Sequence, residues 1–136
     1  MKYLLDSNAC ICWLRHTKPN RVARIKQEPP TNLAICSIVV GELIYGAERA
    51  AVAYRANNRI RVRVEQLRQQ FVSVPFDDSA AEEYGRVRAH LAAVGAPIGP
   101  NDLMIAAISL AHGLILVTHN TKEFSRVPGL SLEDWQ

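Results

Sequence analysis

The chain has 136 residues, a length that favours a single domain. Hydrophobic residues make up 49% of it and charged residues 21%, which is ordinary for a globular protein and too apolar for a disordered one. The net charge of +3 does not by itself indicate a nucleic-acid binder. The longest apolar stretch falls short of the roughly 18 residues that a membrane span needs. We therefore expect one soluble domain over residues 1–136, without membrane contact.

Short apolar runs bounded by turn residues alternate with longer helical patterns along the chain. Such continuous runs are typical of strands in a parallel sheet that is covered on both faces. Buried strands are predicted at 2–5, 33–36, 71–74 and 114–118, and a short edge strand at 130–132.

Two apolar stripes at helical spacing lie between these runs, at 60–71 and 80–94. Gly95 is placed to end the second of these helices. Pro100 suits the first turn of a further helix, which Gly113 would end. Strands that alternate with helices predict a three-layer α/β/α domain around a central parallel sheet of four to five strands.

The chain has three cysteines, Cys10, Cys12 and Cys36, and they form no CxxC pair. An odd count argues against a closed set of disulfides. Asp6 interrupts the first apolar run, so we expect no secretory signal peptide at the N-terminus. We interpret the cysteines as buried thiols of a protein that works in the reducing cytoplasm.

Polar side chains lie near the ends of the predicted strands, where an open parallel α/β sheet places its chemistry. Asp6 follows the first strand, and Glu42 lies early in the helix that follows the second. Asp102 lies in the first turn of the helix that leads into the fourth strand, and Asn120 follows that strand. We expect these four side chains to converge as a catalytic site.

Three convergent carboxylates repel one another unless a cation lies among them. Mg²⁺ and Mn²⁺ prefer oxygen ligands and bind through few carboxylates together with substrate phosphates. Asp6, Glu42 and Asp102 are therefore predicted metal ligands at a site that hydrolyses phosphodiester bonds. Taken alone, Asp6 is explained as the N-cap of a helix, and Asp102 as an acid that complements the helix dipole. Asn120 alone is explained as a turn residue. The prediction therefore depends on the combination of these residues.

Four stretches carry a specific order of motifs: YLLDSN (3–8), SIVVGELIYGAE (37–48), GPNDLMIAAIS (99–109) and LILVTHNTKEFSRVPGLSLEDW (114–135). In this order they resemble the PIN-domain nucleases, and closely the toxin ribonucleases of VapBC toxin–antitoxin modules. The resemblance covers essentially the whole chain.

By this resemblance, the three acids named above match the family's metal-site positions. Asn120 matches a fourth position that is Asp in many relatives, and Asn there lowers the expected affinity for a second metal. Thr118 matches a hydroxyl residue that supports the site, and Asn8 matches the polar residue after the first acid.

The resemblance implies a PIN-like fold and a Mg²⁺- or Mn²⁺-dependent endoribonuclease that cuts structured RNA, such as a tRNA or ribosomal RNA loop. It also implies a homodimer that is neutralised by a cognate VapB-type antitoxin and meets operator DNA only through that antitoxin. Two alternatives stay open, a receiver-like Mg²⁺-binding signalling domain and a catalytically weak PIN-like RNA-binding domain.

Two further features predict binding surfaces. Trp13 and Tyr45 lie in apolar segments and together predict a groove for an amphipathic antitoxin helix. Arg55, Arg59 and Arg63 step by four, so a helix would stack them in one row. Solvent, an acidic antitoxin segment or an RNA backbone would face this row. We favour RNA because the arginine fork matches phosphate oxygens.

Overall fold

The computed structural model describes residues 1–54 and 59–135 of the chain. Within them, five parallel strands form one sheet in the order β3–β2–β1–β4–β5. The strands are β1 (Tyr3–Leu5), β2 (Leu33–Cys36), β3 (Val72–Val74), β4 (Ile115–Val117) and β5 (Leu132–Glu133). The predicted parallel sheet is confirmed, and its fifth strand lies at an edge, beginning two residues and ending one residue later than expected.

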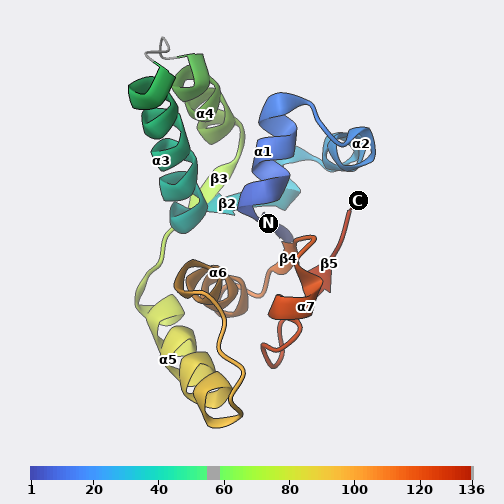
Figure 1. Cartoon of the computed structure of the whole chain (residues 1–136). Helices are drawn as coiled ribbons and strands as arrows, with labels where there is room; N and C mark the ends of the chain where they lie inside the picture. Colours follow the sequence, from blue (N-terminus) through green and yellow to red (C-terminus); the bar gives the residue numbers. More distant parts are fainter. Residues whose placement is uncertain (55–58, 136) are drawn as a thin grey trace.

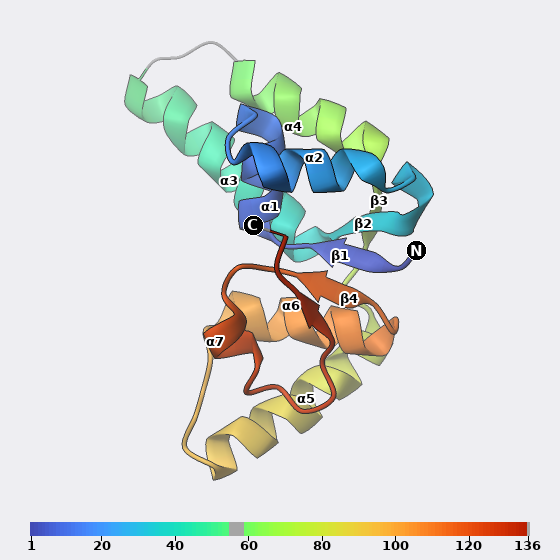
Figure 2. The same cartoon turned by 90° about the vertical axis from the view of Figure 1, so that its right-hand side faces the viewer.

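Helices cover both faces of this sheet, which confirms the three-layer arrangement (Figures 1 and 2). One side carries α1 (Ser7–Arg15), α2 (Pro19–Gln27), α3 (Ser37–Tyr54) and α4 (Arg59–Gln70). The other carries α5 (Asp78–Ala93) and α6 (Pro100–Ala111), which pack against each other. A 3₁₀ turn, η1 (Pro30–Asn32), leads into β2, and the short helix α7 (Thr121–Phe124) follows β4.

Two glycines end their helices as the sequence predicts. Gly95 has a φ of +70° and Gly113 a φ of +63°, a region that an L side chain rarely adopts. After α5, the Ala96 amide donates to the Leu91 carbonyl at 2.9 Å, the long bond of a Schellman motif. The chain therefore turns sharply after α5 and after α6, and the second turn delivers it directly into β4.

The central strands are buried on both faces, which explains their continuous apolar sequences. Leu4, Leu5 and Ile35 are each 0% exposed, whereas Val72 of the edge strand β3 is 55% exposed. Because all strands are parallel, the carboxyl-terminal ends of β1, β2 and β4 lie side by side along one edge of the sheet, the edge across the strand ends, where α1, α3 and α7 begin.

The C-terminal tail is attached to the first strand by an aromatic contact. Trp135 packs its ring edge-to-face on Tyr3, with 4.9 Å between the centroids. The Arg24 guanidinium of α2 lies 4.3 Å from the Trp135 ring centre on the same cluster. In the described residues, no helix is long and apolar enough to cross a membrane.

Only part of the predicted arginine row can be placed. Arg55 lies outside the described residues. Arg59 and Arg63 lie one turn apart in the first half of α4, which runs alongside α3.

Candidate active site

Asp6 connects the end of β1 to the start of α1. Its Oδ1 accepts a hydrogen bond from the Ala9 amide at 2.8 Å, so the carboxylate also caps the helix. Burial raises the pKa of Asp6 above its ordinary value, while hydrogen bonds from Ala9 and Thr118 and the charge of Arg21 oppose the rise. Asp6 is only 7% exposed. The hydrogen bonds from Ala9 and Thr118 hold its carboxylate in one orientation.

Glu42 lies in the second turn of α3 and is half-buried. The Ser7 hydroxyl, in the first turn of α1, donates to its Oε2 at 2.8 Å. This bond joins the beginnings of two helices that follow adjacent strands. Sequence reasoning did not single out Ser7, although its position next to Asp6 is a usable signal.

Asp102 lies in the first turn of α6, and its pKa is raised to about 6. Burial is the main cause, followed by the negative charges of Glu123, Glu42 and Asp6. The three predicted carboxylates are therefore electrostatic neighbours, although they come from three distant parts of the chain.

Glu123 brings a fourth carboxylate to the site and fixes the segment after β4. Its Oε2 accepts from the Asn120 Nδ2 at 2.9 Å and its Oε1 from the Gly99 amide at 3.0 Å. These two bonds lower its pKa, so Glu123 stays ionised beside Asp102. In the sequence, only its place three residues after Asn120 signals this role.

The two predicted supporting residues lie in different surroundings. Thr118 is 2% exposed, hydrogen-bonds with Asp6 and accepts from the Asn120 amide at 3.0 Å. It thus links the loop after β4 to the first carboxylate. Asn8 is an exposed residue in the first turn of α1, and its supporting role stays a prediction.

A buried arginine lies behind the carboxylates, and sequence reasoning missed it. Arg21 of α2 is 4% exposed, and its Nη1 donates to the Cys12 Sγ at 3.2 Å. In the described residues its buried Nη2 has no hydrogen-bond partner. The guanidinium charge favours ionised Asp6. The available signal is the spacing of four from buried Ile25, which places Arg21 on the apolar side of α2.

The residues at this edge suit a hard divalent cation. None of the ion pairs found in residues 1–54 and 59–135 involves Asp6, Glu42 or Asp102. In the same residues, no three acidic, histidine or cysteine side chains form a ready ligand cluster. Mg²⁺ needs only one or two carboxylates because it keeps several of its waters. Oxygen donors with uncompensated negative charge therefore fit such an ion.

A mainly apolar groove opens beside the carboxylates, between α1, α3 and α4, with a volume of about 270 Å³. Its lining includes Glu42, Ile11, Leu14, Leu43, Ile60 and Val64. The structure does not bring Trp13 and Tyr45 together here. Trp13 packs on Phe71 with a centroid distance of 6.0 Å and lines two neighbouring pockets, whereas Tyr45 is 62% exposed and lines none of the pockets described.

Comparison with known proteins places this chain and its fold in one family. The chain belongs to the PIN-domain family, whose model matches residues 3–130. It is 38% identical over 135 residues to the tRNA(fMet)-specific endonuclease VapC of Salmonella typhimurium, covering 99% of this chain and 98% of the relative. It is 34% identical over 135 residues to ribonuclease VapC2 of Haemophilus influenzae, with the same coverage.

Solved structures agree with this assignment. DNA-bound VapBC from Salmonella typhimurium matches with a TM-score of 0.88 at 36% identity, covering 100% of this chain and 99% of that one. VapBC2 from Rickettsia felis, bound to a fragment of promoter DNA, matches with a TM-score of 0.85 at 32% identity and covers both chains fully. Within the PIN domains, the chain is of the VapC type.

The receiver-like alternative is wrong. A receiver of the flavodoxin-like class has the strand order 2-1-3-4-5, whereas this sheet has the order β3–β2–β1–β4–β5.

Replacing Asp102 by Asn should stabilise the fold, and the gain should grow with pH. The folded-state pKa of Asp102 lies near 6, above its ordinary 3.8, so the wild type loses stability as the pH rises between these values. The Asp102→Asn variant has no ionisable group at this position, so it does not lose stability in this way. The measurement is the thermal midpoint of both proteins from pH 4 to pH 8, without divalent cations.

Asp78→Asn is the matched control, because Asp78 is also an acid in the first turn of a helix but is exposed. A midpoint difference between Asp102→Asn and wild type that stays constant over this pH range would contradict the raised pKa.

Proposed function

We propose that this chain is the toxin of a type II toxin–antitoxin module, a Mg²⁺- or Mn²⁺-dependent endoribonuclease that cuts structured RNA. The observation that carries the proposal is the mutual influence of Asp6, Glu42 and Asp102 at one edge of a PIN-domain sheet. A divalent cation at these carboxylates would stabilise negative charge on phosphate oxygens and make an attacking water more acidic.

The protein's own residues hold the oxygen donors in place for this chemistry. The Ala9 amide and Thr118 orient Asp6, Arg21 favours its ionised form, and Ser7 orients Glu42. Asp102 has a pKa near 6 in the absence of a cation, so it is the carboxylate that gains most from one. Such preorganisation lowers the cost of stabilising charge during the reaction.

Asn120 contributes through its amide oxygen. Its Nδ2 is already engaged by Glu123 Oε2, so Oδ1 is the side chain's remaining polar atom. A neutral oxygen at this position holds a water or a second cation less tightly than a carboxylate would. The Asn120→Asp exchange would therefore lower the Mn²⁺ concentration that half-saturates cleavage.

The RNA substrate is proposed from the relatives. Two of them, from Salmonella typhimurium and Shigella flexneri, are named tRNA(fMet)-specific endonucleases and are 38% and 39% identical to this chain. We infer a loop of a structured RNA, tRNA before ribosomal RNA, as the substrate class. The cytoplasm is then the place of action, in keeping with the free cysteines 10, 12 and 36, all of them buried.

A VapB-type antitoxin is the proposed inhibitory partner. The similar structures from Salmonella typhimurium and Rickettsia felis are VapBC assemblies with DNA. In this chain, the apolar groove between α1, α3 and α4 borders Glu42, so a segment bound there would cover the active site. We also propose a homodimer, and contact with operator DNA only through the antitoxin.

Cleavage of bacterial tRNA tests the enzymatic proposal. Asp6→Asn and Asp102→Asn should each lower the Mn²⁺-dependent rate by more than about a hundredfold, because each removes an ionised oxygen donor. Asn still caps α1, so the first variant keeps its helix. Asp78→Asn, outside the site, should cleave like the wild type. Undiminished cleavage by either site variant, or in excess EDTA, would contradict a metal-dependent mechanism.

A matched pair on α4 tests the antitoxin groove. Ile60 lines the groove and is 41% exposed, whereas Val62 is 53% exposed and does not line it. Ile60→Ser should weaken binding of the antitoxin by about tenfold, since burial of the isoleucine side chain is lost. Val62→Ser should leave the affinity unchanged. Calorimetric titration measures both, and equal affinities for the two variants would place the antitoxin elsewhere.

A further inference from the structure

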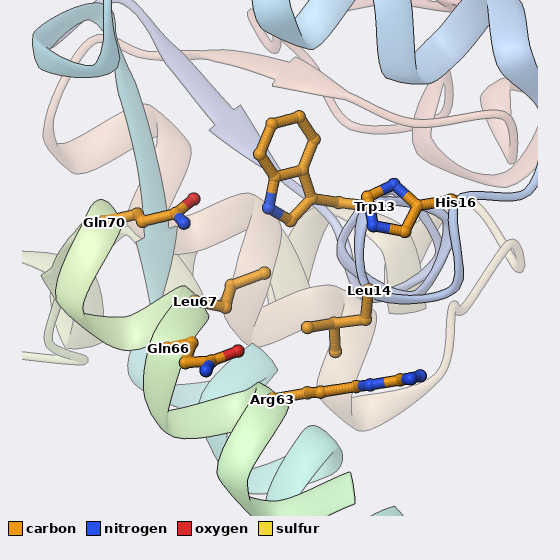
Figure 3. Close-up of a pocket in the computed structure, with 7 residues that line it drawn as sticks. All are labelled: Trp13, Leu14, His16, Arg63, Gln66, Leu67 and Gln70. Carbon is orange, nitrogen blue, oxygen red and sulfur yellow. The ribbon is translucent and has the colours of Figure 1, made fainter.

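A second pocket, of about 220 Å³, lies between α1 and α4 and differs in chemistry from the apolar groove beside it. Figure 3 shows its lining, which comprises Trp13, Leu14, His16, Arg63, Gln66, Leu67 and Gln70. Five of these seven side chains carry a hydrogen-bonding group, and none is a carboxylate. Of the eleven residues around the apolar groove, eight have no polar side-chain atom.

The arrangement of the side chains suits a flat, polar ligand. Gln66 and Gln70, one turn apart on α4, extend toward the hollow, and the Trp13 indole lies across from them on α1 (Figure 3). Leu67 forms the apolar floor between them. Unpaired RNA bases are recognised in this way, by stacking on aromatic rings and by hydrogen bonds from side-chain amides to their edges.

Arg63 adds a positive charge between this pocket and the active site. It lines both the polar pocket and the apolar groove, and Glu42 of the active site also lines that groove. Two of its neighbours on α4 are already paired, because Arg61 and Arg68 share the carboxylate of Glu65 at 3.1 Å each. Arg61 also lies 3.8 Å from the carboxylate of Glu48. Among the ion pairs of the described residues, none uses Arg63. A phosphate of the RNA backbone is a fitting partner for this guanidinium.

We propose that the pocket between α1 and α4 is a nucleobase subsite that takes one unpaired base of the RNA substrate, away from the cleaved bond. Trp13 provides the stacking surface, Gln66 and Gln70 read the base edge, and Arg63 holds the adjoining phosphate. The proposal rests on the ribonuclease function above and adds a specificity-determining site to it. A volume of about 220 Å³ suits one base, and the polar lining distinguishes this pocket from the apolar groove beside it.

Nucleoside monophosphates test the subsite directly, with ribose 5-phosphate as the probe that lacks a base. At millimolar concentrations, at least one of AMP, GMP, CMP and UMP should shift the NMR signals of the Trp13 indole N–H and of the Gln66 and Gln70 amides. Ribose 5-phosphate should bind at least about fivefold more weakly, because stacking on the aromatic ring is absent. Equal affinity for both, or no shift at these signals, would overturn the proposal.

Variants on exposed positions of α4 separate the two recognition elements without disturbing the core. The double variant Gln66→Ala/Gln70→Ala should lose the preference among the four nucleotides, whereas Gln69→Ala, on the same helix but outside the pocket, should keep it. Arg63→Gln should weaken binding of every nucleotide, and of ribose 5-phosphate, to a similar extent. Arg61→Gln removes a charge already paired with Glu65, so it should have a smaller effect.

Two further outcomes bear on the proposal. If the double variant binds nucleotides like the wild type but binds the antitoxin more weakly, the pocket belongs to the protein partner and the proposal is wrong. Cleavage of tRNA is measured on the same variants. Metal-dependent cleavage by the wild type together with unaltered nucleotide binding by the variants would overturn the subsite alone, whereas absence of cleavage by the wild type would overturn the ribonuclease function.

Discussion

The burial of several neighbouring carboxylates at one edge of the sheet is the constraint on which the rest of the site depends. The parallel strand order brings the ends of β1, β2 and β4 together, so Asp6, Glu42 and Asp102 lie close enough to interact electrostatically although they are far apart in the sequence. In the described residues no ion pair involves these three carboxylates, and the pKa of Asp102 is raised, mainly by burial and then by the negative charges of Glu123, Glu42 and Asp6. The folded chain therefore holds partly buried negative charge that a divalent cation would stabilise.

The surrounding structure stabilises the Asp6 carboxylate with hydrogen bonds that orient it and with one buried positive charge. The Ala9 amide and Thr118 hydrogen-bond to Asp6, and Arg21 approaches it from α2 with a buried, incompletely satisfied guanidinium. A buried polar group without a partner lowers stability. The buried guanidinium therefore lowers the stability of the fold but helps to keep the carboxylate oxygens ionised and fixed in position. This is expected of a site that is preorganised for a ligand.

The sequence predicts the sheet well because burial on both faces produces continuous apolar runs that end in turn residues. It also predicts which acids converge, since Asp6 and Asp102 occupy positions set by strand ends and helix starts. It does not reveal Arg21, and for Glu123 it offers only the position three residues after Asn120, because the importance of both residues comes from contacts across the fold. The Trp13 and Tyr45 groove fails for the same reason. Both residues are apolar and near the site in sequence, but Trp13 packs toward Phe71 and Tyr45 points to solvent.

Proton release on cation binding tests the central claim most directly. Calorimetric titration of the wild type with Mn²⁺, in buffers of different ionisation enthalpy, reports the number of protons released for each cation bound. With the Asp102 pKa at about 6, we expect about half a proton to be released at pH 6 and almost none at pH 8. Absence of binding, or equal proton release at the two pH values, would contradict the claim that these carboxylates form a cation-binding site in which the pKa of Asp102 is raised.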